Sequence, residues 1–226
     1  MYTLVYALCA AAQLALAVIA IRLYRRRPSL GALTLILPIA GVVWDNAVVA
    51  LGTSIGEGAL LTALTWPRFV GHALLTPIWI ITAVAFGQRA GIAWLHTRAV
   101  AIGQWVLYAL CVIAGLLRSV IFANMTLATD HGLLYYRNTG SFGPPVGSII
   151  MLLVVLVIGI MVWQRAHTFW MTLGALFMLA MTAIPIHLVG FIASNSGEVI
   201  MAASLVATEH ILQTRARLAG TLASGQ

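Results

Sequence analysis

Lysine is absent from this chain of 226 residues, and charged residues of any kind are few. All twelve basic residues are arginines, and only 8% of the sequence is charged. Without lysine the chain cannot form a retinal Schiff base, which excludes a rhodopsin, and lysine-based covalent catalysis is excluded with it. The net charge of +7 is not accompanied by a basic stripe with interleaved aromatic residues, so we expect no nucleic-acid partner.

Motifs for phosphate and metal chemistry are also missing. The sequence has no Gly-rich phosphate loop and no His-Glu-x-x-His pair. Ionising a diphosphate over several Mg²⁺ ions normally needs a cluster of aspartates, whereas the acidic residues here stand singly, which disfavours intramembrane prenyltransfer. The two cysteines lie inside apolar runs without metal-site spacing, so we expect them to pack as small hydrophobic residues. The five acids are Asp45, Glu57, Asp130, Glu198 and Glu209.

Apolar residues make up most of what is present. They form 62% of the chain, and the mean hydropathy is +1.03, far from the values of soluble domains. Runs of roughly 20 apolar residues, the length that crosses a bilayer, recur along the whole chain and leave no room for a soluble domain. We therefore predict an all-α polytopic membrane protein, a seven-transmembrane-helix bundle that forms one domain over residues 1–226. The spans are expected at 2–22, 30–52, 69–87, 100–122, 147–164, 168–192 and 197–213.

The arginines predict how this bundle is oriented. Under the positive-inside rule the end richer in arginine faces the cytoplasm, so the N-terminus is expected outside and the C-terminus inside. The high Ala, Leu and Arg content without lysine favours a bacterial plasma membrane. The predicted inner end holds Arg22, Arg25, Arg26, Arg27, Arg89, Arg98, Arg165, Arg215 and Arg217, and the predicted outer end holds Arg68, Arg118 and Arg137.

Two outer connections stand out. The longest connection, residues 123–148, contains Tyr135 and Tyr136, and its length is typical of functional lids, so we expect a partly ordered lid. The connection that contains Glu57 and Arg68 is expected to form a short interfacial helix, with Trp66 at the level of the lipid headgroups. At the opposite end, Glu209 and His210 are expected at the interface.

Polar residues of five spans gather in the predicted outer half. Asp45 lies about 10 Å and His187 about 8 Å inside the outer ends of their spans, given the helical rise per residue. Ionisable groups at such depths are tolerated when they face inward and pair, or line a wet cavity. Nearby prolines can bend the helices and open such a cavity. The outer-half set is Asp45, Asn46, His72, Arg118, His187 and Glu198.

A protonated carboxylic acid in an apolar pocket is a proton donor. Such an acid can protonate an olefin or epoxide of a lipid, while aromatic rings shield the positive charge that develops. The product would be a cyclised isomer, made without a metal or other cofactor. Candidate shielding rings are Trp44, Tyr108, Tyr135, Tyr136 and Phe191.

The pair Trp44-Asp45 late in the second span, together with Glu198 in the last span, resembles the small seven-helix integral membrane terpene cyclases of meroterpenoid pathways. In that family an acid after a Trp in an early span and an acid in the last span are the proposed catalytic pair. This chain has Asp where Glu is expected, and Glu198 lies at the start of its span. The resemblance implies a terpene cyclase that acts on a lipidic prenyl substrate in the bilayer.

These observations lead to assignments for individual residues. Asp45 is the candidate general acid, tuned by Asn46 and His72, and Glu198 or His187 is the candidate terminal base. Substrate-binding roles are expected for Asn46, Arg118, Trp44, Tyr135, Tyr136, Glu57 and Arg68.

Two alternatives stay open. The His, Asp and Arg residues could instead serve a lipid hydrolase through a bound metal ion, or they could bind the phosphate of a lipid headgroup. In a bundle without enzymatic activity, they would only specify helix packing, for example through an Asp45–Arg118 pair.

Overall fold

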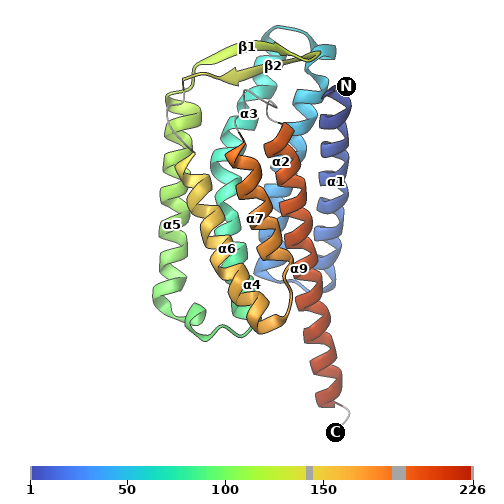
Figure 1. The fold of residues 1–226 in the computed structure, drawn as a ribbon, viewed down its shortest axis with the longest axis vertical. Helices are drawn as coiled ribbons and strands as arrows, with labels where there is room; N and C mark the ends of the chain where they lie inside the picture. The colour runs from blue at the N-terminus through green and yellow to red at the C-terminus, as the bar shows by residue number, and fades with distance from the viewer. Residues whose placement is uncertain (1, 141–144, 185–191, 225–226) are drawn as a thin grey trace.

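The computed structural model describes residues 2–140, 145–184 and 192–224, and its helices stand side by side along one long axis (Figure 1). A short β-hairpin lies across the end that also holds the N-terminus, and the last helix projects from the opposite end. The α-helices are α1 (Tyr2–Arg26), α2 (Leu30–Ile55), α3 (Ala59–Leu75), α4 (Trp79–Arg89), α5 (Arg98–Leu116), α6 (Val146–Ala166), α7 (Trp170–Ala183) and α9 (Ile192–Ser224).

Five helical segments of the described residues are long and apolar enough to cross a membrane. α7 is apolar as well, but its described part has 14 residues. This pattern fits the predicted class, a helical membrane protein. The five segments are Tyr2–Arg26, Leu30–Ile55, Ala59–Arg89, Arg98–Ile121 and Val146–Ala166.

The predicted start of the third span, at residue 69, was wrong. α3 begins at Ala59, directly after a tight turn in which Gly56 and Gly58 adopt positive φ angles of 79° and 148°. Glycine adopts such angles without the steric penalty of a Cβ atom, so three residues suffice to reverse the chain. Residues Ala59–Leu75 form this one helix in place of the expected separate interfacial helix, and Arg68 lies more than two turns inside it.

α3 and α4 form one rod with a break in the middle. Pro77 has no backbone N–H to donate, and residues Thr76–Ile78 form a 3₁₀ turn, η1, between the two helices. A second irregular turn ends α5, where Leu117–Ile121 form a π-helical segment, η3, and the amide of Phe122 bonds to the carbonyl of Leu117. Both irregular turns border the cavity described below.

The prediction of an all-α fold missed the hairpin. Strands β1 (Met125–Asp130) and β2 (Leu133–Asn138) pair antiparallel, with Asp130 opposite Leu133. His131 and Gly132 make the two-residue turn with φ angles of 49° and 84°, the geometry that suits the twist of a hairpin. The connection predicted as a lid therefore contains an ordered sheet that contacts α2 and α3.

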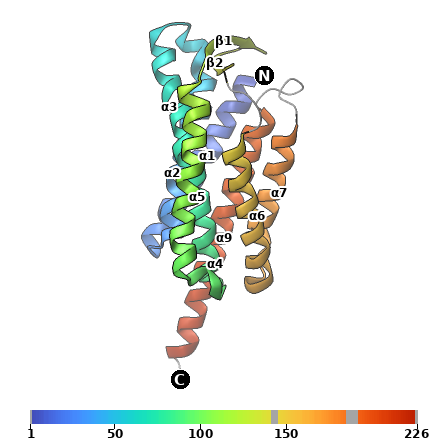
Figure 2. The same cartoon turned by 90° about the vertical axis from the view of Figure 1, so that its left-hand side faces the viewer.

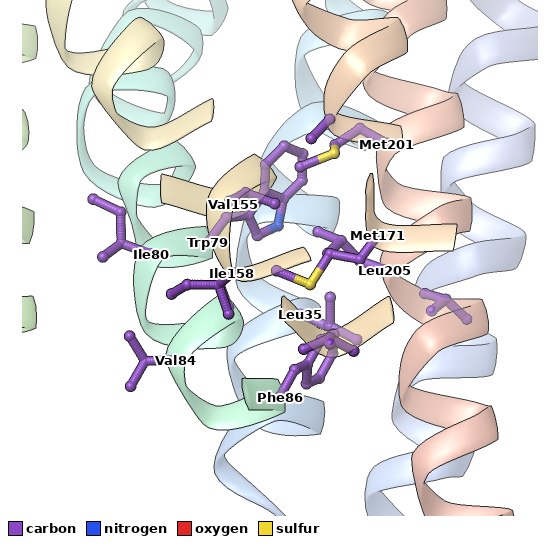
Figure 3. Packing of buried hydrophobic residues seen from close by; sticks show 14 of the residues in the cluster. Leu35, Trp79, Ile80, Val84, Phe86, Val155, Ile158, Met171, Met201 and Leu205 are labelled. Carbon is purple, nitrogen blue, oxygen red and sulfur yellow. The ribbon is translucent and has the colours of Figure 1, made fainter. Parts of the chain in front are cut away.

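The main hydrophobic core lies toward the end opposite the hairpin. Trp79 and Phe86 of α4 pack there against apolar side chains of α2, α6, α7 and α9, among them Leu35, Val155, Met171 and Met201 (Figure 3). In the hairpin half, α3 and α5 lie on one side, and α6 and α7 lie on the other (Figure 2). A cavity occupies this half of the bundle, beneath the hairpin.

Candidate functional site

The cavity has a volume of about 880 Å³, within the range of small-molecule binding sites. Its walls come from α1, α2, α3, η1, α4, α5, η3, β2, α6, α7 and α9, and they are mainly apolar. The ionisable lining residues come from several of these elements, as the sequence predicted for the outer half of the bundle. They are Asp45, Arg68, His72, Cys111, Arg118, Tyr6, Tyr135, Tyr136, Arg137 and Glu198.

Asp45 and Arg68 form a buried ion pair. The Nε atom of Arg68 donates to Oδ1 of Asp45 at 2.5 Å, and the two side chains are only 10% and 8% exposed. The early turn at Gly56 places α3 alongside α2 and so brings Arg68 opposite Asp45. The expected partner of Asp45, Arg118, is therefore not the residue that pairs with it in this salt bridge.

His72 and Glu198 form the second pair. His72 lies one turn after Arg68 on α3, and its Nε2 atom is 3.1 Å from Oε1 of Glu198 on α9. The second carboxyl oxygen of Glu198, Oε2, is buried and has no hydrogen-bond partner among the described residues. A buried oxygen of this kind loses its hydration without compensation unless a ligand or water satisfies it.

Two asparagines tie α2 to α9 beside these pairs. The side-chain amide of Asn195 donates to Oδ1 of Asn46 at 2.8 Å, and the amide of Asn46 donates to the carbonyl of Val42 at 3.0 Å. Asn46 is fully buried, while Asn195 lines the cavity one turn before Glu198. Asn46 therefore fixes the distance between the helices that carry Asp45 and Glu198. Asn195 did not appear in the sequence prediction, because no motif marked it.

Arg118 and Arg137 line the cavity near the hairpin. Arg118 lies in the π-helical turn η3. The backbone carbonyl of Arg118 accepts a hydrogen bond from the side-chain amide of Asn138 at 3.1 Å. Arg137 precedes Asn138 on β2 and is exposed. The hairpin thus brings a second arginine close to η3, at a site that neither segment would form alone.

Tyr135 and Tyr136 both line the cavity, as predicted. Tyr135 is 8% exposed and packs with Tyr6, Val49 and Leu133, which holds the hairpin on α1 and α2. Burial raises the pKa of the Tyr135 phenol, so this group stays neutral at physiological pH. Tyr6 was not predicted, because a lone tyrosine near the start of an apolar helix carries no sequence signal.

Three other predicted residues do not line the cavity. Trp44 is 42% exposed, and its indole donates to the carbonyl of Leu64. It neighbours Asp45 in sequence, but successive helical side chains point about 100° apart, so the two cannot face the same cavity. Glu57 is exposed in the turn between α2 and α3, and Tyr108 donates to the carbonyl of Leu74. His187 and Phe191 lie outside the described residues.

The sequence Gly52-Thr53-Ser54-Ile55-Gly56 matches the Gly-x-Ser-x-Gly pattern of serine hydrolases. That pattern makes a nucleophile only on a sharp turn between a strand and a helix. Ser54 instead lies exposed in the last turn of α2. The match therefore gives no support to hydrolase chemistry.

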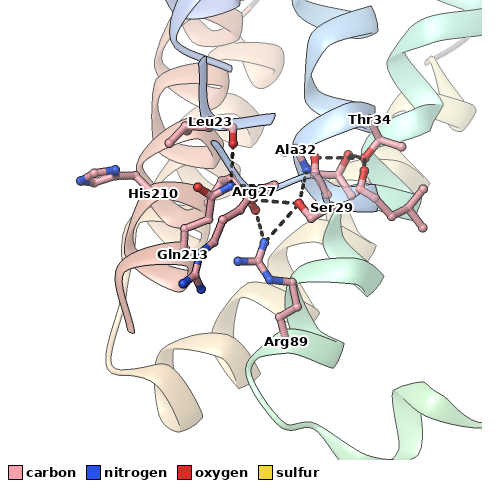
Figure 4. Close-up of polar contacts among 12 residues, drawn as sticks. Leu23, Arg27, Ser29, Ala32, Thr34, Arg89, His210 and Gln213 are labelled. Atoms are coloured by element: carbon pink, nitrogen blue, oxygen red, sulfur yellow. Dashed lines mark hydrogen bonds and ion pairs between the residues drawn. The ribbon is translucent and has the colours of Figure 1, made fainter. Parts of the chain in front are cut away.

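Glu209, which was expected at the membrane interface, is fully buried at the other end of the bundle. Its carboxylate accepts hydrogen bonds from Arg89 at 2.5 Å, Ser29 at 3.0 Å and Gln213 at 2.7 Å. Gln213 also donates to the carbonyls of Leu23 and Arg27, while His210 points away from this network (Figure 4). Both carboxylate oxygens of Glu209 thus have hydrogen-bond partners. Because the cluster joins α1, α2, α4 and α9, we assign it a structural role.

Within the described parts of the chain, no three His, Cys, Asp or Glu side chains come together in a way that could hold a metal ion. His72 and Glu198 form a pair without a third such side chain in metal-binding position among the described residues.

No protein-family model matches this chain, and a search of curated proteins found no significant match to its sequence.

Proposed function

We propose that the chain crosses the membrane seven times, with the hairpin and the N-terminus outside and the C-terminus in the cytoplasm. The continuous rod of α3 and α4 counts as one span in this topology. The other six spans are α1, α2, α5, α6, α7 and α9. The arginines support the orientation, because nine lie toward the end opposite the hairpin and three lie around the cavity. For a bacterial protein, the membrane would be the plasma membrane.

Within that bundle we propose an active site that cyclises a lipidic prenyl substrate by proton transfer, as in the integral membrane terpene cyclases that the chain resembles. The observation that carries the proposal is the unpartnered Oε2 atom of Glu198, which is buried in a mainly apolar cavity of about 880 Å³. A carboxylic acid that holds its proton in such a cavity can donate it to a bound olefin or epoxide.

Glu198 suits the role of general acid better than Asp45, to which the sequence assigned it. Asp45 is bound by the permanently charged Arg68, and this pairing stabilises the carboxylate. Glu198 faces the imidazole of His72, which can donate from Nε2 to Oε1 and leave Oε2 to carry the acidic proton. His72 would also stabilise the carboxylate that remains after the proton has left.

The reaction balances without an oxidant or a reductant. Glu198 gives its proton to one carbon of a double bond, or to an epoxide oxygen, and a cation forms on the neighbouring carbon. A second double bond attacks that cation and closes a ring, and the new cation then loses a proton to form a double bond. Asp45, ionised beside Arg68, is the acceptor that the cavity offers for this last proton. The product is an isomer of the substrate.

Aromatic rings around the cavity support the same chemistry. Tyr6, Trp79, Tyr135 and Tyr136 line the cavity in which the cation would form. An aromatic face attracts a cation through its quadrupole, by about 0.5–2 kcal/mol for each ring. These rings also exclude water, which would otherwise trap the cation as an alcohol.

The test is expression in a host that makes polyprenoids, with lipid extracts compared by mass spectrometry against the empty vector. We expect a new compound with the same mass as a host prenyl lipid and a different retention time. A rise in lysophospholipids or free fatty acids without any prenyl isomer would contradict cyclisation and favour lipid hydrolysis.

A further inference from the structure

The charges of the cavity do not balance. Its described lining residues include three arginines, Arg68, Arg118 and Arg137, and two carboxylates, Asp45 and Glu198. Three positive charges against two negative ones leave one positive charge in excess, and the excess is two when Glu198 is neutral. Arg137 is exposed, so water screens part of its charge, but the excess still makes the potential of the cavity positive and favours an anionic ligand.

Arg68 has a donor to spare. Its Nε atom is taken by Asp45, but its Nη1 atom is buried and has no hydrogen-bond partner among the described residues. The side chain is nine-tenths buried and borders the cavity. A guanidinium donates five hydrogen bonds in a rigid fork that fits carboxylate and phosphate oxygens, so the free edge of Arg68 suits an anion.

Arg137 belongs to the same region as Arg68. Both side chains line the same cavity, and Tyr135, two residues before Arg137 on β2, lines it with them. Arg118 lies close to Arg137, because its backbone carbonyl accepts a hydrogen bond from Asn138, the neighbour of Arg137 on β2. The positive charge is therefore concentrated beneath the hairpin, at the predicted outer surface of the membrane.

The opposite wall of the cavity is apolar. Met151 and Leu152 of α6 and Met178 and Met181 of α7 line it without a charged neighbour on either helix inside the cavity. Methionine side chains are flexible and adapt to chains of irregular shape. The side of the cavity that carries the arginines thus suits an anion, and the side formed by α6 and α7 suits a hydrocarbon chain.

We infer that the cavity binds a prenyl lipid whose polar end is an anionic oxygen group, a carboxylate or a phosphate, held by Arg68 with Arg118 and Arg137 nearby. This inference names the substrate class for the proposed function and rests on it for the prenyl chain. The anion site itself rests on the buried Nη1 atom of Arg68 and on the charge of the cavity. It also orients the ligand, because a fixed polar end places the double bonds of the chain among the aromatic rings.

Binding of three matched C15 probes to the purified protein in detergent tests the inference. The probes are farnesoic acid, farnesyl monophosphate and the neutral alcohol farnesol, and microscale thermophoresis gives the dissociation constants. A charge-assisted hydrogen bond to a buried guanidinium should make at least one anion bind about tenfold more tightly than farnesol. The anion that gains more identifies the group as carboxylate or phosphate.

Variants separate this site from general surface charge. Arg137→Gln should weaken binding of the preferred anion and leave farnesol unchanged, whereas Arg98→Gln, an exposed arginine outside the cavity, should change neither. The double variant Asp45→Asn/Arg68→Gln keeps the buried charge balanced and should abolish the preference for the anion. Equal binding of all three probes, no binding of any of them, or equal losses in Arg137→Gln and Arg98→Gln would overturn the inference.

The outcomes are independent of catalysis. A clear preference for an anion together with no prenyl isomer in the host would keep the anion site and contradict the cyclase. An isomer formed by a protein that binds farnesol as tightly as both anions would keep the cyclase and contradict the anion site.

Discussion

Arg68 and Asp45 face each other across α2 and α3 as an ion pair with an Nε–Oδ1 distance of 2.5 Å, beneath the hairpin and largely shielded from solvent. The pair links the two helices that form one wall of the cavity. Burying both charges costs desolvation energy that a packed apolar pair would avoid. In the proposed mechanism, the position of the pair beside His72 and Glu198 gives that cost a functional reason.

Removing one partner of this pair should destabilise the protein more than removing both. Arg68→Gln leaves the Asp45 carboxylate buried without its counter-ion, and we expect a loss of about 3 kcal/mol or more in unfolding free energy. The double variant Asp45→Asn/Arg68→Gln should recover most of that loss. Unfolding in mixed micelles, followed by tryptophan fluorescence, measures both. A single variant as stable as the wild type would contradict a buried ion pair.

The hairpin should depend on Gly52. A Cβ atom at this position of α2 would overlap the backbone carbonyl oxygen of Leu134 on β2, and backbone cannot move aside as a flexible side chain can. Gly52→Ala should therefore lift the hairpin and speed its cleavage by added protease. Gly71→Ala is the matched control, since a Cβ there meets nothing within 4 Å. Equal cleavage of the two variants would show that the hairpin does not rest on α2 at Gly52.

The Glu209 cluster should be structural and separate from catalysis. Glu209→Ala leaves the Arg89 guanidinium without its counter-ion, which should cost about 2–4 kcal/mol of stability. Any conversion by the protein that remains folded should continue. The exposed Glu57 provides the control variant Glu57→Ala, with unfolding measured as above. Loss of conversion in a well-folded Glu209→Ala protein would place the cluster in the mechanism.

The proposed orientation predicts which cysteines react from outside the cell. In a background with Cys9 and Cys111 replaced by alanine, Thr129→Cys places a thiol on the hairpin, and Thr214→Cys places one near the far end of α9. Both positions are exposed. A membrane-impermeant maleimide should label the first in intact cells and the second only after lysis. The reverse pattern would invert the topology.

Much of the helical pattern could be predicted from the sequence, because apolar runs of span length are a strong signal. The start of α3 could not be predicted, because the turn at Gly56–Gly58 is short and because Trp66 and Arg68 suggested a polar connection. The hairpin was missed because Leu133–Asn138 lacks the strict alternation of a half-buried strand. The two-residue turn at His131–Gly132, between segments rich in Thr and Tyr, was the available signal.

The polar cluster was predicted better than its internal pairing. Depth along the spans grouped Asp45, His72 and Glu198, which do meet in one cavity. The depth of a residue in the membrane does not fix the rotation of its helix about the helix axis. The sequence therefore could not reveal that Arg68 pairs with Asp45 and that His72 pairs with Glu198. That pairing is what moves the proposed acid from Asp45 to Glu198.

The most direct test of this assignment compares Glu198→Gln with Glu57→Gln in the polyprenoid-producing host, at equal membrane levels of the two proteins. Glutamine keeps the size of the side chain and can still accept from His72 through its carbonyl, but it has no acidic proton to give. We expect the prenyl isomer with the wild type and with Glu57→Gln, and its disappearance with Glu198→Gln. Undiminished isomer from a Glu198→Gln protein would show that the proton comes from elsewhere and would contradict the proposed mechanism.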